Sequence, residues 1–187
     1  MKTFANKILG GWLVATALAC APLAGAADLD AAQQGKVDAK VKEIQSWAAT
    51  PTIVDAVKAY NSGKSPEAAA MDQTKWAGLS VIDPFVRNLT KNPAAELLKT
   101  KKGEVVSEAF VSGADGGKVA FLGKPTNWSH KGKPKHEQPM SGKNWQGPVE
   151  IDESSGLQQV QVAVPVVDGG KPIGSLVVGL SIGKIGK

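Results

Sequence analysis

Apolar positions in the first half of the chain recur at the spacing of an α-helix. Val37, Val41, Ile44 and Ala48 recur with Asp, Lys and Gln residues between them, which predicts an amphipathic helix soon after Asp28. Further helices are expected wherever a capping residue precedes a proline, because proline suits the first helical position. This pairing occurs at 50–51, 65–66, 83–84 and 92–93, and the last helix is expected to end near residue 101.

The second half of the chain changes to the period of a β-strand. Val160, Val162, Val164 and Val166 alternate with a second set of side chains that includes Gln159, Gln161 and Ala163, so the two sets face opposite sides of a strand. Glycine-rich turns at 113–117 and 168–170 indicate hairpins. Strands are therefore expected at 104–112, 118–123, around 148–151, 157–167 and 173–182.

Helices followed by consecutive strands predict an α+β fold with N-terminal helices and a five-stranded antiparallel sheet. Pro165 is unexpected within such a strand, because proline has no N–H for the ladder. It is expected either near a sheet edge or at a β-bulge. The segment between the second and third strands, 123–148, has no hydrophobic period. A long irregular loop inside a compact domain is usually functional.

The N-terminal segment, 1–27, has the features of a secretory signal peptide. Two lysines precede an uncharged segment, 8–27, in which Ala24-Gly25-Ala26 matches a cleavage site. Cleavage is expected near Ala26 or Ala27, which leaves residues 28–187 as a single domain in the periplasm. An uncleaved membrane anchor remains an alternative, because about 20 apolar residues can span a bilayer.

The single cysteine, Cys20, lies within this leader and adds lipidation as a further alternative. If the leader is cleaved, the mature chain has no disulfide and its folding rests on a hydrophobic core. The whole chain has a net charge of +5, and removal of Lys2 and Lys7 leaves 20 basic and 17 acidic residues, or +3. So small and dispersed a charge predicts no nucleic-acid partner.

The stretch 127–145 contains both histidines and two of the five tryptophans. Binding pockets are mostly apolar with a few placed polar groups. Trp128 and Trp145 can therefore wall a small-molecule pocket through their flat faces and N–H groups. They can equally pin a long loop onto the sheet, and the sequence leaves both interpretations open.

Three segments of the second half follow one another in a distinctive order. They are VSEAFVSGADGGKVAFLG, then VEIDESSGLQQVQVAVPVVDGGKPIG, then the glycine-containing strand SLVVGLSI. Together, over about 80–182, they resemble the extracytoplasmic Cache (PDC, PAS-like) sensor domains of bacteria. The resemblance implies a five-stranded antiparallel sheet behind a long N-terminal helix, with ligand bound on one sheet face beneath the loop between the second and third strands.

The same resemblance implies a set of ligand-binding residues. Such domains have an aromatic after the second strand and a tryptophan near the end of the loop, and Trp128 and Trp145 match these places. Phe121, Asn127 and Asp152 complete the expected site. Because the sequence ends soon after the last strand, a freestanding sensor domain is expected. It would bind an unidentified small molecule, without a cofactor, and signal to a membrane receptor or kinase.

Two alternatives remain beside the sensor interpretation. His130, His136 and Met140 suit copper, although lysines in the same stretch would repel a cation. A protein-interaction module without a small ligand is the other alternative. The chain has no H-E-x-x-H motif and no phosphate-binding loop of the form G-x-x-x-x-G-K-[ST], so no enzymatic activity is expected.

Overall fold

The computed structural model describes residues 29–151, 156 and 158–185. The expected signal peptide, Cys20 and Asp152 lie outside the described residues. Within the described part of the chain, no helix is both long and apolar enough to cross a bilayer.

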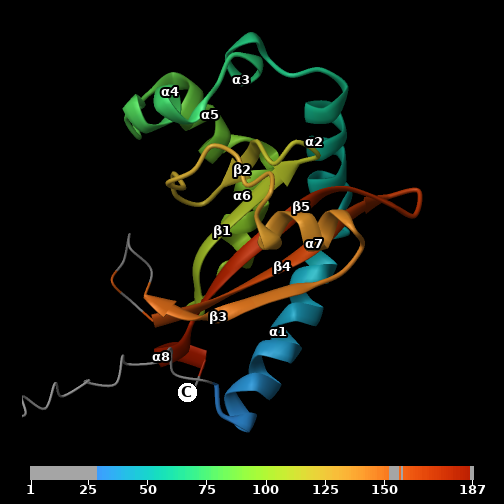
Figure 1. Cartoon of the computed structure of the whole chain (residues 1–187), viewed down its shortest axis with the longest axis vertical. Helices are drawn as coiled ribbons and strands as arrows, with labels where there is room; N and C mark the ends of the chain where they lie inside the picture. The colour runs from blue at the N-terminus through green and yellow to red at the C-terminus, as the bar shows by residue number, and fades with distance from the viewer. Residues whose placement is uncertain (1–28, 152–155, 157, 186–187) are drawn as a thin grey trace, which may run out of the picture.

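Within the described residues, six helices precede the first strand, and five strands then follow with one helix inserted among them, so the α+β prediction is confirmed (Figure 1). The elements are α1 (Ala31–Ala48), α2 (Pro51–Ser62), α3 (Pro66–Ala69), α4 (Gln73–Gly78), α5 (Pro84–Lys91), α6 (Pro93–Lys101), β1 (Val106–Gly113), β2 (Lys118–Phe121), α7 (Pro134–Met140), β3 (Trp145–Ile151), β4 (Gln158–Asp168), β5 (Lys171–Ser181) and α8 (Ile182–Ile185).

The capping residues expected from sequence begin three of the helices. The side chains of Ser65, Asp83 and Asn92 each accept a hydrogen bond from a backbone N–H in the first turn, which satisfies a donor that the helix leaves unpaired. Thr50 precedes α2 as expected but forms no such bond. Its hydroxyl instead donates to the carbonyl oxygen of Trp47 at 2.8 Å and so joins α2 to the end of α1.

The strands form one antiparallel sheet in the order β2-β1-β5-β4-β3, with β5 at its centre. This order explains Pro165. The pairing of β4 with β3 extends only as far as Ala163, whereas Pro165 is paired on its other side with Ser175 of β5. The proline therefore lies where β4 has become the edge of the sheet, which is one of its two expected positions.

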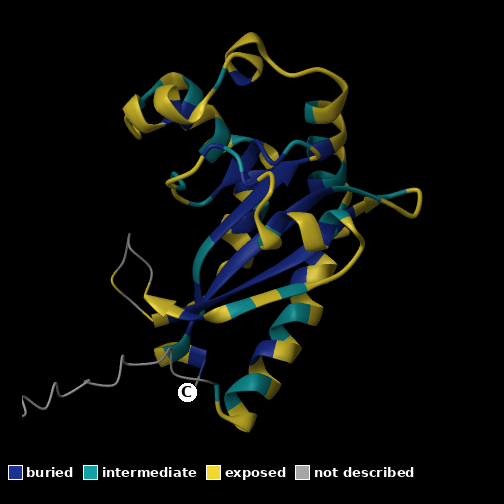
Figure 2. Ribbon diagram, in the orientation of Figure 1, coloured by how far each residue is buried: buried dark blue, intermediate teal, exposed yellow. Residues whose placement is uncertain are grey.

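One face of the sheet, here called the proximal face, packs against α1, α2 and α6. Val160, Val162, Val164 and Val166 are fully buried there, as the alternating pattern predicts. Figure 2 shows β1, β4 and β5 as a largely buried layer beside the half-exposed α1, whereas the edge strand β3 is mostly exposed or intermediate. This face contains the larger of the two hydrophobic clusters.

The opposite face, here called the distal face, is covered by α7 and by the segment 122–133, while α4 and α5 pack at its β2 end (Figure 1). The expectation of an irregular loop over 123–148 is wrong in part. The helix α7 forms inside it, and β3 begins at Trp145, three residues before the expected strand. Proline at the first position of α7 and glycine at positive φ just after it, at Gly142, suit a short helix.

Candidate functional site

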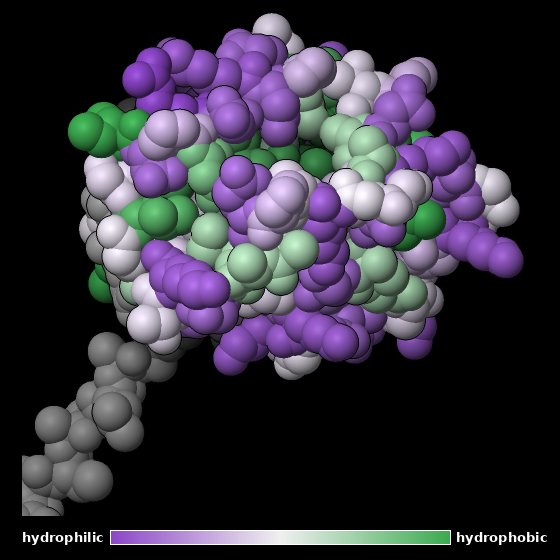
Figure 3. Space-filling view, turned by 90° about the horizontal axis from the view of Figure 1, so that it is seen from above, coloured by the Kyte–Doolittle hydropathy of each residue, from purple (hydrophilic) through white to green (hydrophobic). Residues whose placement is uncertain are grey.

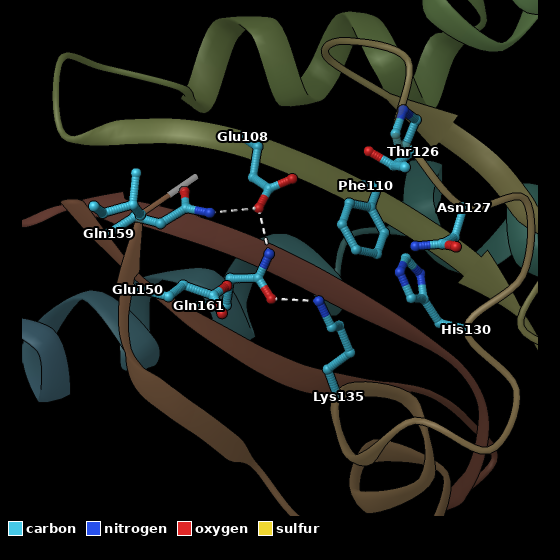
Figure 4. A pocket seen from close by; sticks show the side chains of 11 residues that line it. Glu108, Phe110, Thr126, Asn127, His130, Lys135, Glu150, Gln159 and Gln161 are labelled. Atoms are coloured by element: carbon cyan, nitrogen blue, oxygen red, sulfur yellow. Dashed lines mark hydrogen bonds between the residues drawn. The ribbon is translucent and has the colours of Figure 1, made fainter. Parts of the chain in front are cut away.

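A cavity of about 220 Å³ lies on the distal face, over β1 and β4 and beneath the segment 125–135 (Figure 4). We call it the distal cavity. Strand residues form its floor and the covering segment forms its wall. The lining residues are Glu108, Phe110, Pro125, Thr126, Asn127, His130, Lys135, Glu150, Ile151, Gln159 and Gln161.

A glycine at the centre of the sheet makes room for the floor of the distal cavity. Gly179 of β5 is paired with Glu108 of β1 on one side and with Gln161 of β4 on the other. A Cβ atom at this position would stand 2.4 Å from Gln159 Oε1 and 2.7 Å from Glu108 Cγ. The absence of a side chain therefore allows polar groups of the outer strands to meet over β5.

These polar groups form a hydrogen-bonded chain that converges on one carboxylate oxygen (Figure 4). Gln159 donates from Nε2 to Glu108 Oε1 at 3.0 Å, and Gln161 donates from Nε2 to the same atom. Lys135 Nζ donates to Gln161 Oε1, and Ser107 Oγ donates to Gln159 Oε1 at 2.6 Å. Both glutamine side chains are buried, and pairing offsets the free energy that their burial costs.

The wall of the distal cavity contains an aromatic stack supported by a buried lysine. The rings of Phe110 and His130 lie 4.9 Å apart at 17°, and Lys118 Nζ lies 2.8 Å from His130 Nδ1 and 3.3 Å from the carbonyl oxygen of Gly116. Burial, helped by the charge of Lys135, lowers the pKa of Lys118 to about 7. Burial and the nearby Lys118 lower the pKa of His130 to about 2.

His136 is also buried, on the side of α7 that faces the sheet. Its Nδ1 lies 2.9 Å from Ser175 Oγ and its Nε2 lies 3.3 Å from the carbonyl oxygen of Ala114. Burial holds its pKa below 6.5. Both ring nitrogens of this histidine thus have protein partners. In the described part of the chain, no three His, Cys, Asp or Glu side chains form a cluster suited to a metal ion.

The five residues expected to bind ligand have different surroundings in the structure. Asn127 lines the distal cavity. Phe121 and Trp128 lie in an aromatic cluster with Trp76, at ring distances of 5.9 and 5.2 Å from it. Trp145, at the edge strand, borders a separate groove beside α1, and Asp152 lies outside the described residues.

Trp76 explains the placement of Trp128. Its indole N–H donates to the carbonyl oxygen of Pro125 at 2.8 Å, and Gln73 accepts a hydrogen bond from the backbone N–H of Trp128 at 2.9 Å. Both contacts come from α4. They fix the start of the covering segment, and Trp128 packs in the aromatic cluster instead of lining the distal cavity.

Three floor residues were absent from the expected site. Glu108 stands as a charged residue in an otherwise largely apolar strand, and Gln159 and Gln161 occupy the second set of positions in the alternating strand β4. These are the signals that were available from sequence. That these three side chains lie close together depends on the strand order, in which β5 lies between β1 and β4.

A second and more apolar cavity, of about 620 Å³, lies between α2, α5 and α6 beside the edge strand β2. Ala56, Tyr60, Phe85 and Leu89 are among its lining residues. Figure 3 views this end of the molecule, where apolar surface in green is bordered by polar groups in purple. Lys118 also lines this second cavity. Because its Nζ contacts His130, Lys118 lies between the second cavity and the Phe110–His130 wall of the distal cavity.

No family model and no curated protein matches the sequence. Among solved structures, the chain is similar to the DcuS sensor domain of E. coli at 15% identity and a TM-score of 0.47, over 84% of this chain and 96% of that one. It is similar to the ligand-binding domain of the Pseudomonas aeruginosa amino acid chemoreceptor PctC, solved with GABA, at 12% identity and a TM-score of 0.44, over 81% of this chain.

A third similar structure is the sensor domain of the V. cholerae histidine kinase DctB, at 14% identity and a TM-score of 0.37, over 80% of this chain. The chain spans 56% of the PctC domain and 59% of the DctB domain. All three are sensor or ligand-binding domains, the class of protein that the sequence resembles.

Proposed function

We propose that this chain is an extracytoplasmic sensor or binding module that takes a small polar molecule into the distal cavity. The observation that carries the proposal is the converging network on the cavity floor, in which Glu108, Gln159 and Gln161 meet over Gly179. The proximal face of the same sheet is closed by valines and leucines, whereas this part of the distal face keeps polar groups around an open volume.

The size and composition of the distal cavity suit a metabolite-sized ligand. Drug-sized pockets measure about 300–1,000 Å³, so a cavity of about 220 Å³ takes a smaller molecule. Polar groups that converge on a cavity fix the orientation of a ligand and distinguish it from others. In the proposed site, Asn127 and His130 approach the ligand from the wall while Glu108 and the two glutamines approach it from the floor.

A route from the distal cavity to the N-terminal helices supports a role in signalling. The backbone N–H of His130 donates to the carbonyl oxygen of Gly116 at 3.1 Å, in the β1–β2 turn. The same turn is held from the end of α2 and the residues just after it, because Ala114 donates its backbone N–H to Asn61 Oδ1 at 2.9 Å and Asp115 forms an ion pair with Lys64. A ligand that repositions His130 would therefore act on the turn and, through it, on α2.

The location and the partner belong to the same proposal. The chain is secreted to the periplasm after cleavage of 1–27, and a membrane receptor or kinase receives the bound state. The intact mass of the protein purified from its host tests the first part, because it identifies the mature N-terminus. Retention of the full leader, or lipid on Cys20, would replace the free periplasmic protein by a membrane-attached one.

Native mass spectrometry of the protein, purified without chelator from its own host, tests the ligand site. Wild-type protein should show an adduct of a small organic molecule. Gly179→Ala should lose it, because the added Cβ displaces Gln159 and Glu108. Gly123→Ala is the matched control, since a Cβ there meets no atom within 4 Å, and it should keep the adduct.

The other outcomes of this experiment separate the alternatives. An adduct that persists in Gly179→Ala would place the ligand elsewhere in the molecule. An adduct with the mass of one copper or zinc ion, lost on substitution of His130 and His136 together, would favour the metal-binding alternative. A bare mass in every sample would favour the protein-interaction alternative, for which a pull-down from periplasmic extract is the direct test.

A further inference from the structure

The hydrogen bonds on the floor of the distal cavity all run in one direction. Lys135 donates to Gln161 and Ser107 donates to Gln159, and each glutamine then donates from Nε2 to Glu108 Oε1. A carboxylate can only accept, so the amide nitrogens must face Glu108. Each donor on the floor is thus paired with an acceptor on the floor, and the last acceptor in this hydrogen-bonded series is Glu108. The series therefore ends on a group that can accept further hydrogen bonds.

That remaining capacity belongs chiefly to Glu108. Both amide nitrogens bind its Oε1, and among the described residues its Oε2 has no hydrogen-bond partner. Ion pairs between described residues do not include Glu108 either. In Figure 4 this second oxygen points away from Gln161, the glutamine that accepts a hydrogen bond from Lys135. An ionised carboxylate with one oxygen free at a cavity is a binding group for a cation or a strong donor.

Among the described residues, the other charged side chains that line the distal cavity are Glu150 and Lys135. Lys135 is engaged with Gln161, and His130 of the wall is neutral at physiological pH because its buried ring is hard to protonate. Two carboxylates and one lysine leave the described part of the lining with one excess negative charge. A ligand carboxylate would have to approach Glu108 and Glu150, and like charges repel most strongly where water is partly excluded.

From the direction of these hydrogen bonds and the balance of charge we infer that the distal cavity selects a small molecule bearing a protonated amine, with Glu108 as its counter-ion, and rejects molecules whose corresponding group is a carboxylate. This inference rests on the proposed function, because it assigns the ligand class of the same site. The amine donates to Glu108 Oε2 and supplies the one positive partner that the floor lacks. Gln159 and Gln161 orient the carboxylate toward it.

Three small probes that differ at one end provide the test. Ethanolamine, ethylene glycol and glycolate share a hydroxymethyl group and carry an ammonium, a hydroxyl and a carboxylate at the other end. Each is titrated into isotope-labelled protein, and dissociation constants are taken from amide shifts in β1 and β4. Ethanolamine should bind at least about tenfold more tightly than ethylene glycol, because its ammonium adds ionic attraction to the hydrogen bond with Glu108, whereas the hydroxyl of ethylene glycol is a neutral donor. Glycolate should bind weakest.

Two variants assign the selectivity to Glu108. Glu108→Gln removes the charge but keeps the shape, and it should abolish the preference for ethanolamine over ethylene glycol. Glu104→Gln makes the same charge change at an exposed residue that does not line the cavity, and it should keep the preference. If Glu108→Gln does not fold, the ranking of the three probes on wild-type protein still decides the question.

Specific outcomes overturn the inference. The inference is wrong if glycolate binds most tightly of the three probes. It is also wrong if the three probes bind with equal affinity or if none of them binds measurably. Retention of the ethanolamine preference in Glu108→Gln overturns it as well. Failure of the proposed function looks different, because the host adduct would then be absent or would persist in Gly179→Ala. A native adduct that is lost in Gly179→Ala, together with a preference for glycolate, would leave the site in place and reverse its charge selectivity.

Discussion

Lys118 makes the stability of this protein depend on pH in a way that a surface lysine would not. Its side chain is fully buried in β2, and its Nζ contacts His130 and the carbonyl oxygen of Gly116 but forms no ion pair with a described carboxylate. Burial and the charge of Lys135 lower its pKa from 10.5 to about 7, while Asp115 and Glu108 act in the opposite direction. Removing this charge with Lys118→Met should therefore change how stability responds to pH.

The sign follows from proton binding. Between pH 7 and 10.5 the unfolded chain holds the proton of this lysine more readily than the folded chain does. The free energy of unfolding therefore increases with pH across this window, and below pH 7 the folded state bears the whole unfavourable contribution. One pKa unit corresponds to about 1.36 kcal/mol, so the gain between pH 7 and about pH 10 is on the order of 4 kcal/mol.

Urea unfolding followed by tryptophan fluorescence measures this gain at intervals between pH 7 and about pH 10. Wild-type protein should gain stability as the pH rises, and Lys118→Met should not. Lys42→Met, at an exposed position of α1, is the matched control and should behave as wild type. The range stops near pH 10 because the pKa of Tyr60 is raised by burial, and deprotonation of that tyrosine in the unfolded chain opposes the trend at higher pH.

The reasoning is refuted if wild-type stability is constant or falls across this range. It is also refuted if Lys118→Met retains the increase, because the titrating group would then be another residue. If Lys118→Met changes the slope of the unfolding free energy against urea concentration but keeps the pH response of the wild-type protein, the substitution has altered the unfolded state. That result would not support the argument.

Three further predictions concern stability. As pH falls through 6.5, the free energy of unfolding should decrease. His130 and His136 have lowered pKa values in the folded state, so the unfolded chain takes up protons first. Equal urea midpoints above and below this pH would contradict the prediction. Gly35→Ala should stabilise the protein by about 0.5–1 kcal/mol, since this exposed helical glycine has no atom within 4 Å of a Cβ; a lower Tm would exclude this. Trp76→Ala should lower the unfolding free energy by about 3–5 kcal/mol, because the indole is fully buried and hydrogen-bonded; a loss below about 1 kcal/mol would show that the aromatic cluster does not hold the covering segment.

Much of the fold follows from local sequence patterns. The valine alternation of β4, the hairpin turns and the cap-plus-proline pairs each depend on neighbouring residues, and the structure confirms them. The helix α7 lacks such a signal, because only His136 and Pro139 of it are buried. Two buried positions in seven residues do not make a hydrophobic period. The helix α4 is capped by Asp72 but has no proline at its first position, so the pairing that predicts the other helices is absent.

The candidate site was less predictable because its residues meet only in three dimensions. Glu108 and Gln161 are brought together by β5, which lies between their strands and has Gly179 at the point of crossing. From sequence, Trp128 was expected to bind ligand. In the structure its ring packs 5.2 Å from that of Trp76, and this contact could not be predicted because Trp76 lies in a helix that is distant in the sequence. Asn127, next to it in the chain, is the expected residue that lines the cavity.

Under the proposed function, one face of the sheet stabilises the fold and the other binds the ligand. The four valines of β4 and the β5 residues Leu176, Val178 and Leu180 bury their side chains against α1, α2 and α6, and full burial of each such side chain contributes about 1.5–3 kcal/mol. With this free energy gained on the proximal face, the distal face can hold a glycine, a carboxylate and two amides at the centre of the sheet without loss of the fold. Substitutions within the Glu108 network should therefore affect ligand binding more than folding, which is the condition that makes the probe and variant experiments interpretable.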